Sequence, residues 1–296
     1  TVASTQVATA KFTPYNIQQQ VNSSIILKAG AIQDYAFNIS LVSNAAPAIL
    51  IDTVAPTVSI TMSRNIVSSV NTSLVTFTFS EDPGASFNWN GSVGDITITN
   101  GTLGAISGTG LTRTAVYTPT PSLASGTGSI SVTANSYQDA AGNNGSTGVS
   151  SNLSLDTLAP SIASLALSSA TGAVASPLDA TVKLLNAADT LSATVTFNEA
   201  VTLNTTAGSP TLALVIGSST VQATYVSGSG TSALVFSTTI VSGQTDTDGV
   251  AIAVNALSLN GATLKDSAGN TSVITSIAVA NNPLYLVDTT APSVSI

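Results

Sequence analysis

Three short phrases recur along this chain, and their recurrence restricts the fold to an array of similar units. The phrase Asp-Thr-x-Ala-Pro begins at Asp52, Asp156 and Asp288. A second phrase, Asp-x-Ala-Gly-Asn, begins at Asp139 and Asp266, and each copy is followed closely by a copy of the first. A chain that repeats itself after roughly a hundred residues is expected to fold as consecutive modules of one kind.

The remaining repeats set the module boundaries. Phe-x-Glu ends at Glu81 and at Glu199, each time after an alternating run, and Asp34 begins a degenerate copy of the second phrase. The stretch before Asp34 corresponds to the stretch before Asp139, so the first unit lacks the counterpart of its own opening strands. The predicted modules are an incomplete C-terminal part at 1–51, complete modules at 52–155 and 156–287, the latter longer, and the first strand of a following module at 288–296.

The residues between these phrases alternate between apolar and polar side chains, which is typical of strands with one buried face. Asn-Gly and Asp-Gly pairs at Asn100, Asp248 and Asn260 separate them, and we expect these glycines to supply the positive φ of hairpin turns. The alternating segments are 75–79, 95–99, 114–117, 129–132, 193–197, 212–215 and 233–236. We therefore predict an all-β chain of immunoglobulin-like β-sandwich modules in a linear array, since such sandwiches take about a hundred residues.

Composition excludes several functions. The chain has neither cysteine nor histidine, which excludes disulfides, thiolate metal sites and the commonest general base. Six basic residues face fourteen acidic ones, so a nucleic acid would find few cations for its phosphates. The sequence also lacks an apolar run of the roughly 20 residues that cross a bilayer. We expect no nucleic-acid partner and no membrane-spanning segment.

The three phrases together resemble the tandem bacterial immunoglobulin-like repeats of large surface adhesins and related secreted repetitive proteins. The resemblance covers essentially the whole chain. It implies an extracellular protein of the cell surface whose partners are neighbouring modules, copies of the same protein, and host or matrix glycans and proteins. It also implies calcium binding at module junctions.

The acidic residues gather in these phrases, and sandwich topology is expected to bring them together in space. The loop after the second strand and the loop before the last strand lie at the pole where the chain enters a sandwich. Three carboxylates without a basic neighbour repel one another unless a cation intervenes, and Ca²⁺ prefers such oxygen ligands. The expected Ca²⁺ ligands are Asp52, Glu81, Asp139 and Asn143 in one module, Asp156, Glu199, Asp266 and Asn270 in the next, and their counterparts Asp34 and Asp288.

Two other interpretations of the acids stay open. They could be turn formers and solvated loop charges, because Asp is favoured in turns. They could also be a catalytic pair of the kind that hydrolyses glycosides. An enzyme is the less favoured hypothesis, because the same acids recur in every repeat and the chain has few aromatic residues to seat a sugar.

The favoured function is mechanical, that of an adhesive stalk segment stiffened by calcium. A second hypothesis is a self-assembling surface-layer, sheath or filament subunit, and a third is a glycan-binding or phage-decoration module. For the third, Phe87 and Trp89 could form a glycan platform, or one of them could fill a sandwich end. The incomplete end modules indicate either a window cut from a longer polypeptide or copies that complete each other by strand addition.

Overall fold

The computed structural model describes residues 7, 9–15 and 20–294, and this part of the chain is all-β. Its described residues form 23 strands and one short 3-10 turn, η1 (Gly84–Ser86). No helix among them is long and apolar enough to cross a membrane.

The chain folds into two compact units that do not follow the repeats residue by residue. The first comprises residues 1–65, 73–118 and 127–153, and the second comprises residues 66–72, 119–126 and 154–296. Two segments of the 52–155 repeat, 66–72 and 119–126, are therefore parts of the second unit. The module boundaries drawn from the repeats stay a prediction.

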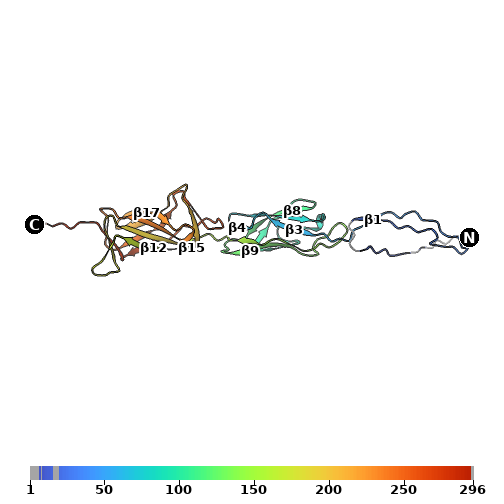
Figure 1. The fold of residues 1–296 in the computed structure, drawn as a ribbon, viewed down its shortest axis with the longest axis horizontal. Helices are drawn as coiled ribbons and strands as arrows, with labels where there is room; N and C mark the ends of the chain where they lie inside the picture. Colours follow the sequence, from blue (N-terminus) through green and yellow to red (C-terminus); the bar gives the residue numbers. More distant parts are fainter. Residues whose placement is uncertain (1–6, 8, 16–19, 295–296) are drawn as a thin grey trace. The chain divides into compact units, whose positions relative to one another are not determined.

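The first unit begins with a narrow antiparallel pair, β1 (Val21–Ser23) with β2 (Ile49–Ile51). The chain between these strands folds back on itself, with backbone hydrogen bonds such as that from the Ser43 amide to the Leu27 carbonyl oxygen, and its apolar side chains are exposed, Tyr35 and Leu41 among them (Figure 1). Ile51 is the buried apolar residue of this segment. Two strands with one buried side chain bury too little apolar surface to be stable alone.

Residues 58–155 form an immunoglobulin-like sandwich of two sheets. One sheet has the order β3 (Val58–Met62), β5 (Ser73–Phe79), β8 (Thr112–Pro119) and β7 (Gly101–Leu103). The other has the order β10 (Gly148–Val149), β9 (Gly126–Val132), β11 (Leu153–Leu155) and β4 (Ile66–Val67), with β6 (Ile96–Thr99) also on β9. The parallel pairing of β4 with β11 is the exception to the antiparallel pairs around it.

Alternation explains the core of this sandwich, because every second side chain of β5 is buried. Phe77 and Phe79 come from that strand and contact Phe87, with ring centroids 5.6 and 4.8 Å apart, and Tyr137 contacts Phe79 at 5.4 Å. Phe87 is thus a core residue. Trp89 is partly buried, and its Nε1 donates to the carbonyl oxygen of Leu103 at 3.2 Å.

The Asn100-Gly101 pair has a different geometry from the expected hairpin. Asn100 takes the positive φ, 52°, and β6 before it pairs with β9 whereas β7 after it pairs in the other sheet. The pair is a corner at which the chain changes sheets. Glycine is needed at position 101, because the ring of Tyr117 fills the space that a side chain there would occupy.

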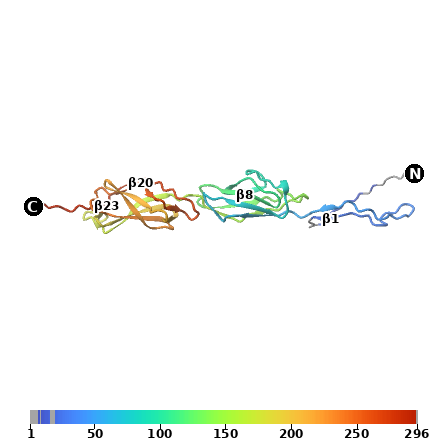
Figure 2. The same cartoon turned by 90° about the horizontal axis from the view of Figure 1, so that it is seen from above.

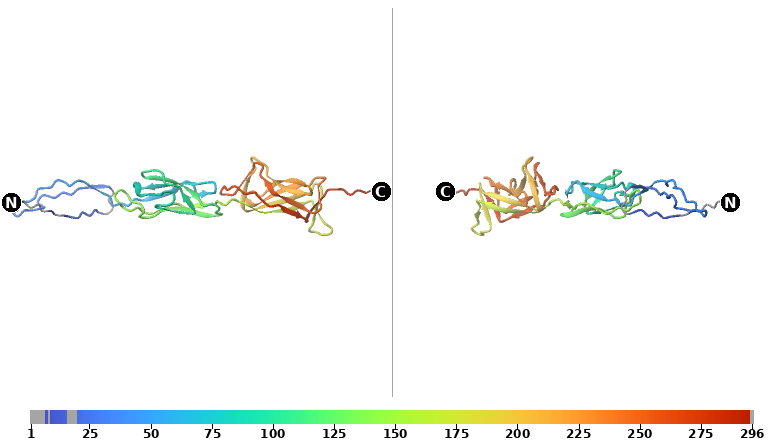
Figure 3. Two further views of the ribbon diagram at one scale, coloured as in Figure 1. Left: turned by 180° about the vertical axis from the view of Figure 1, so that it is seen from behind. Right: turned by 45° about the vertical axis from the view of Figure 1, so that its right-hand side comes forward.

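The second unit holds a larger sheet and a smaller one. The larger sheet has the order β12 (Ile162–Thr171), β15 (Thr190–Asn204), β18 (Thr231–Thr239), β17 (Ser219–Ser227), β16 (Thr211–Ile216), β20 (Val250–Ser258) and β22 (Val279–Asn282), with β21 (Thr263–Lys265) on β15. The smaller has the order β13 (Val174–Ala175), β14 (Lys183–Leu185), β23 (Tyr285–Asp288) and β19 (Thr245–Asp246). Figures 2 and 3 show these strands from further sides.

Strand β15 does not end at its Phe-x-Glu phrase, in contrast to β5, which ends at Phe79. Its register against β18 shifts between Thr196 and Val201, and beyond the shift the strand pairs with β21. Glu199 therefore lies on an irregular stretch inside a long strand. Because of this bulge, Glu199 lies outside the regular strand pairing, as Glu81 does beyond the end of β5.

The end of the chain differs from the strand expected at 288–296. Asp288 is the last residue of β23, which belongs to the preceding sheet, and 289–294 contain no strand. Residues 295 and 296 lie outside the described residues. No strand of the described chain pairs with 289–294, and an isolated extended segment lacks the ladder that defines a strand. Its assignment to a following module stays a prediction.

Candidate metal centres

Each copy of the Asp-Thr-x-Ala-Pro phrase opens with a turn made by its aspartate. Asp52 Oδ1 accepts a hydrogen bond from the amide two residues further on at 3.1 Å, and Asp288 Oδ1 does so at 2.9 Å. The amide of Leu158 makes the corresponding bond to Asp156. Such turns fix the direction of the aspartate side chain at the start of the linker.

The second phrase forms one loop in all three of its copies. The Oδ1 of Asp34, Asp139 and Asp266 accepts the amide of the asparagine four residues on at 2.9, 2.9 and 2.8 Å. Their Oδ2 accepts the side-chain amide of the same asparagine at 2.8, 2.8 and 2.7 Å. Phe37 takes a φ of 66° where the other two loops have glycine. The Asp-to-Asn spacing therefore defines the loop, even at the cost of a strained residue.

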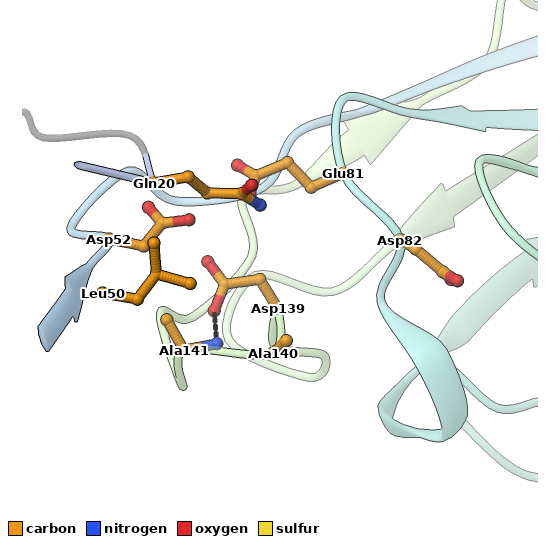
Figure 4. A pocket seen from close by; sticks show the side chains of 8 residues that line it. All are labelled: Gln20, Leu50, Asp52, Glu81, Asp82, Asp139, Ala140 and Ala141. Atoms are coloured by element: carbon orange, nitrogen blue, oxygen red, sulfur yellow. Dashed lines mark hydrogen bonds between the residues drawn. The ribbon is translucent and has the colours of Figure 1, made fainter. Parts of the chain in front are cut away.

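The three phrases meet in space in both units. Each of Asp52, Glu81 and Asp139 brings a carboxylate oxygen within 4.8 Å of the other two, and Figure 4 shows them facing one another. The second cluster has the same geometry. It consists of Asp156, Glu199 and Asp266. Within each cluster, the three acids that sandwich topology places at one pole of the module are thus neighbours in the structure.

The first cluster lies in an open pocket. Gln20 and Leu50 line it beside the three acids, while the side chain of Asp82 points away from them in Figure 4. Asp82 instead contacts Arg113 at 3.1 Å, the sole ion pair within the described residues. No basic side chain of the described chain pairs with the cluster, so its negative charge is left to solvent or to a cation.

Burial and mutual repulsion act on the glutamate of the first cluster. Burial raises the pKa of Glu81, and the charges of Asp52 and Asp139 raise it further. The Oε1 atom of Glu81 is shielded from solvent and has no hydrogen-bond partner in the described structure. A shielded carboxylate oxygen without a partner is unfavourable, and an ion or a proton would relieve it.

The second cluster has the same electrostatics in a more enclosed setting. Burial raises the pKa of Glu199, with further contributions from Asp156 and Asp266. Burial also raises the pKa of Asp156, and the charge of Asp266 adds to it. Asp266 is buried and Asn270 has no exposed surface.

The two asparagines contact the acids as hydrogen-bond donors. Asn143 Nδ2 donates to Asp139 Oδ2 and to the carbonyl oxygen of Asp52 at 3.2 Å. Asn270 Nδ2 donates to Asp266 Oδ2 and to the carbonyl oxygen of Asp156 at 3.0 Å. With the amide nitrogen toward the carboxylates, these residues orient the acids. Ligation of an ion by their side-chain oxygens, as expected from the sequence, stays a prediction.

Asp34 and Asp288 join neither cluster. Both are exposed, and each makes the local turn of its own phrase. Hydrogen bonds from Asn38 lower the pKa of Asp34, because they favour its charged form. Among the described residues, neither has two further acids beside it.

Comparison with known proteins identifies the module that carries the first cluster. Residues 52–155 match the sequence model of the family described as bacterial Ig-like domain. Residues 52–155 are a bacterial Ig-like domain. No curated protein matches the chain. This domain contains the Asp52, Glu81 and Asp139 cluster in full.

Solved structures similar to the chain include two segments of titin and one adhesin. The I9–I11 tandem of titin is 6% identical, with 80% of this chain and 64% of that chain covered and a TM-score of 0.29. The adhesin InvE of Yersinia pseudotuberculosis is 16% identical, with 76% and 58% covered and a TM-score of 0.24. The A168–A169 segment of titin is 10% identical, with 80% and 100% covered and a TM-score of 0.21. The chain spans less than two thirds of the length of the first two.

The threonine of the linker phrase has a structural role that was not expected from the sequence. Thr157, next to the Ig-like domain, accepts the amide of Leu123 at 2.9 Å and donates to the carbonyl of Thr120 at 2.8 Å. Thr289 does the same with the amide of Gly243 and the carbonyl of Gln244, both at 2.9 Å. The recurrence of threonine beside every linker aspartate was the available signal.

Proposed function

We propose that this chain is a structural, adhesive segment of a repetitive cell-surface protein, and that Ca²⁺ binds at both acid clusters. One observation carries the proposal. In each unit, three phrases far apart in sequence deliver one carboxylate each to the same point, and one of the three is the linker aspartate. An ion there would tie the linker to two loops of the module that follows it.

The donor set favours calcium among the cations. The chain offers carboxylates and backbone carbonyls and has neither cysteine nor histidine, so the hard cations are the ones that fit. Three carboxylates with neighbouring carbonyl oxygens and water would make up the six to eight oxygens that Ca²⁺ takes. The shielded Oε1 of Glu81, which has no protein donor in the described residues, is a suitable ligand atom.

The surface location and the absence of catalysis are parts of the same proposal. Calcium sites of this kind suit the extracellular medium, where the ion is abundant. The first cluster lies in a pocket whose other lining residues include Leu50 and two alanines, which offer no aromatic surface for a sugar ring. The partners we propose are adjoining Ig-like modules and copies of the same protein, with matrix or host ligands bound elsewhere.

Small-angle X-ray scattering and electron microscopy of the full chain, with calcium and with a chelator, test the proposal. We expect a narrower distribution of bending with calcium, because the ion removes freedom from the linkers. The double variant Glu81→Gln/Glu199→Gln should resemble the chelated protein in both conditions. An identical distribution for the wild type in calcium and in chelator would rule the proposal out. Large lateral assemblies in either condition would favour the lattice or filament hypothesis instead.

A further inference from the structure

Ser69 reaches the second acid cluster from a position 201 residues away in sequence. Its amide and its Oγ both donate to Asn270 Oδ1, at 2.8 and 2.6 Å. Ser69 lies in the turn after β4, within the 66–72 segment that belongs to the second compact unit. A residue of the Ig-like domain is therefore in direct contact with the loop of Asp266.

Asn270 has every polar atom of its side chain engaged. Its Nδ2 donates to Asp266 Oδ2 at 2.7 Å and to the carbonyl oxygen of Asp156 at 3.0 Å, while its Oδ1 accepts both donors of Ser69. The residue is fully buried, so water cannot replace a lost partner easily.

The direction of the Asn270 amide depends on what faces its two ends. A side-chain amide is nearly symmetric in shape, so only its hydrogen-bond partners decide whether oxygen or nitrogen faces the acids. Two donors from Ser69 on one side and carboxylate and carbonyl acceptors on the other favour a single orientation. That orientation supplies a donor, and not a further negative oxygen, to Asp266 and Asp156.

We propose that Ser69 is a positioning residue of the second cation site, which couples that site to the turn at 66–72 of the preceding repeat. The inference rests on the proposed function, because it concerns the same cluster. Asn143, the counterpart of Asn270, makes the matching contacts with Asp139 and Asp52 but receives no corresponding donor at Oδ1 from the described residues. The second site is thus the better organised of the two and the tighter for Ca²⁺.

Calcium titration by calorimetry tests this coupling in the full chain. A Glu81→Gln background leaves the second cluster as the one with three acids. In that background Ser69→Ala should weaken Ca²⁺ binding about three- to tenfold, the effect of one lost hydrogen bond. Ser69→Thr keeps the hydroxyl and should restore the affinity. Ser125→Ala is the matched control, since Ser125 is exposed in the same unit and makes no side-chain hydrogen bond within the described structure.

Hydrogen exchange in chelator separates failure of the coupling from failure of the calcium proposal. Ser69→Ala should speed hydrogen exchange at the backbone amide of Asn270 about threefold or more, whether or not an ion binds. A wild type that binds no Ca²⁺ would overturn the proposed function, and the exchange data would then decide the coupling alone. If Ser69→Ala changes neither affinity nor exchange, or if Ser69→Thr fails to rescue, the coupling is wrong.

Discussion

The hydroxyl of Tyr137 lies 3.2 Å from the carbonyl oxygen of Pro56, the residue that ends the linker phrase of the Ig-like domain. It lies 3.0 Å from the carbonyl oxygen of Ser146 as well, and the amide of Ser146 donates to Pro56. The fully buried Tyr137 ring, packed against Phe79, therefore joins the linker to the segment after the Asp139 loop. One side chain, that of Tyr137, therefore connects the hydrophobic core to the two segments that carry Asp52 and Asp139.

Gly145→Ala should destabilise the Ig-like domain by about 1–3 kcal/mol, because the added methyl group would overlap the ring of Tyr137 and force it to move. Denaturant unfolding followed by fluorescence of Trp89 measures the loss. Gly104→Ala is the control. A methyl group at position 104 would lie 3.7 Å from the Val116 carbonyl oxygen, which is an ordinary contact. The free energy of unfolding of Gly104→Ala should therefore differ little from that of the wild type. Equal effects of the two substitutions would contradict the tight packing.

Seven of the 23 strands of the described residues could be predicted from the sequence, because their alternation of apolar and polar side chains follows one buried face. The segments 75–79 and 193–197 lie within β5 and β15, and their alternation reports burial directly. The convergence of the acids was also predictable, since the order of strands in a sandwich determines which loops share a pole. The contact from Ser69 was not, because a single serine that recurs nowhere in the phrases carries no periodic signal. The donor role of Asn270 depends on that contact, so it escaped prediction for the same reason.

Glu81→Gln should remove most of the calcium-dependent rise in melting temperature of the Ig-like domain. A ligand present at a hundredfold excess over its Kd stabilises the native state by about 2.7 kcal/mol, and the substitution takes away one of three charged ligands. Without calcium the same variant should be slightly more stable than wild type, since it no longer repels Asp52 and Asp139. Calorimetry with and without chelator measures both effects.

Asp82→Asn provides the control for that experiment. Asp82 is adjacent to Glu81 but is turned toward Arg113, and its side chain is 53% exposed. The Arg113 side chain is 7% exposed, so the substitution should lower the stability of the domain with and without calcium alike, and it leaves the three acids of the cluster in place. The calcium-dependent rise should therefore survive in full, and its loss would show that charge in general, and not the cluster, determines the response.

The metal-free protein should become more stable on mild acidification. Burial and neighbouring carboxylates raise the pKa of Glu81 and Glu199 above 4.5, so the native state binds protons that the unfolded state does not. That stabilisation is complete below pH 4.5 and is lost as the pH rises through the higher native pKa values. In chelator, the melting temperature should increase as the pH is lowered from 7 to 5. The increase should be smaller in the double variant Glu81→Gln/Glu199→Gln. With calcium present the trend should reverse, because protons compete with the ion. A flat profile in chelator would show that the acids do not interact.

Thr157→Val should loosen the second acid cluster without touching an acid. The Thr157 side chain is buried and bridges the Leu123 amide and the Thr120 carbonyl, so an isosteric valine leaves both groups with an apolar neighbour. We expect a loss of about 1–3 kcal/mol in the free energy of unfolding. Because Asp156 adjoins it in the linker, we also expect weaker Ca²⁺ binding at the second cluster and unchanged binding at the first. Thr290→Val, at an exposed position of a later copy of the phrase, should change neither quantity. Unaltered calcium affinity in a destabilised Thr157→Val protein would show that the two hydrogen bonds of the Thr157 side chain stabilise the linker but do not position Asp156.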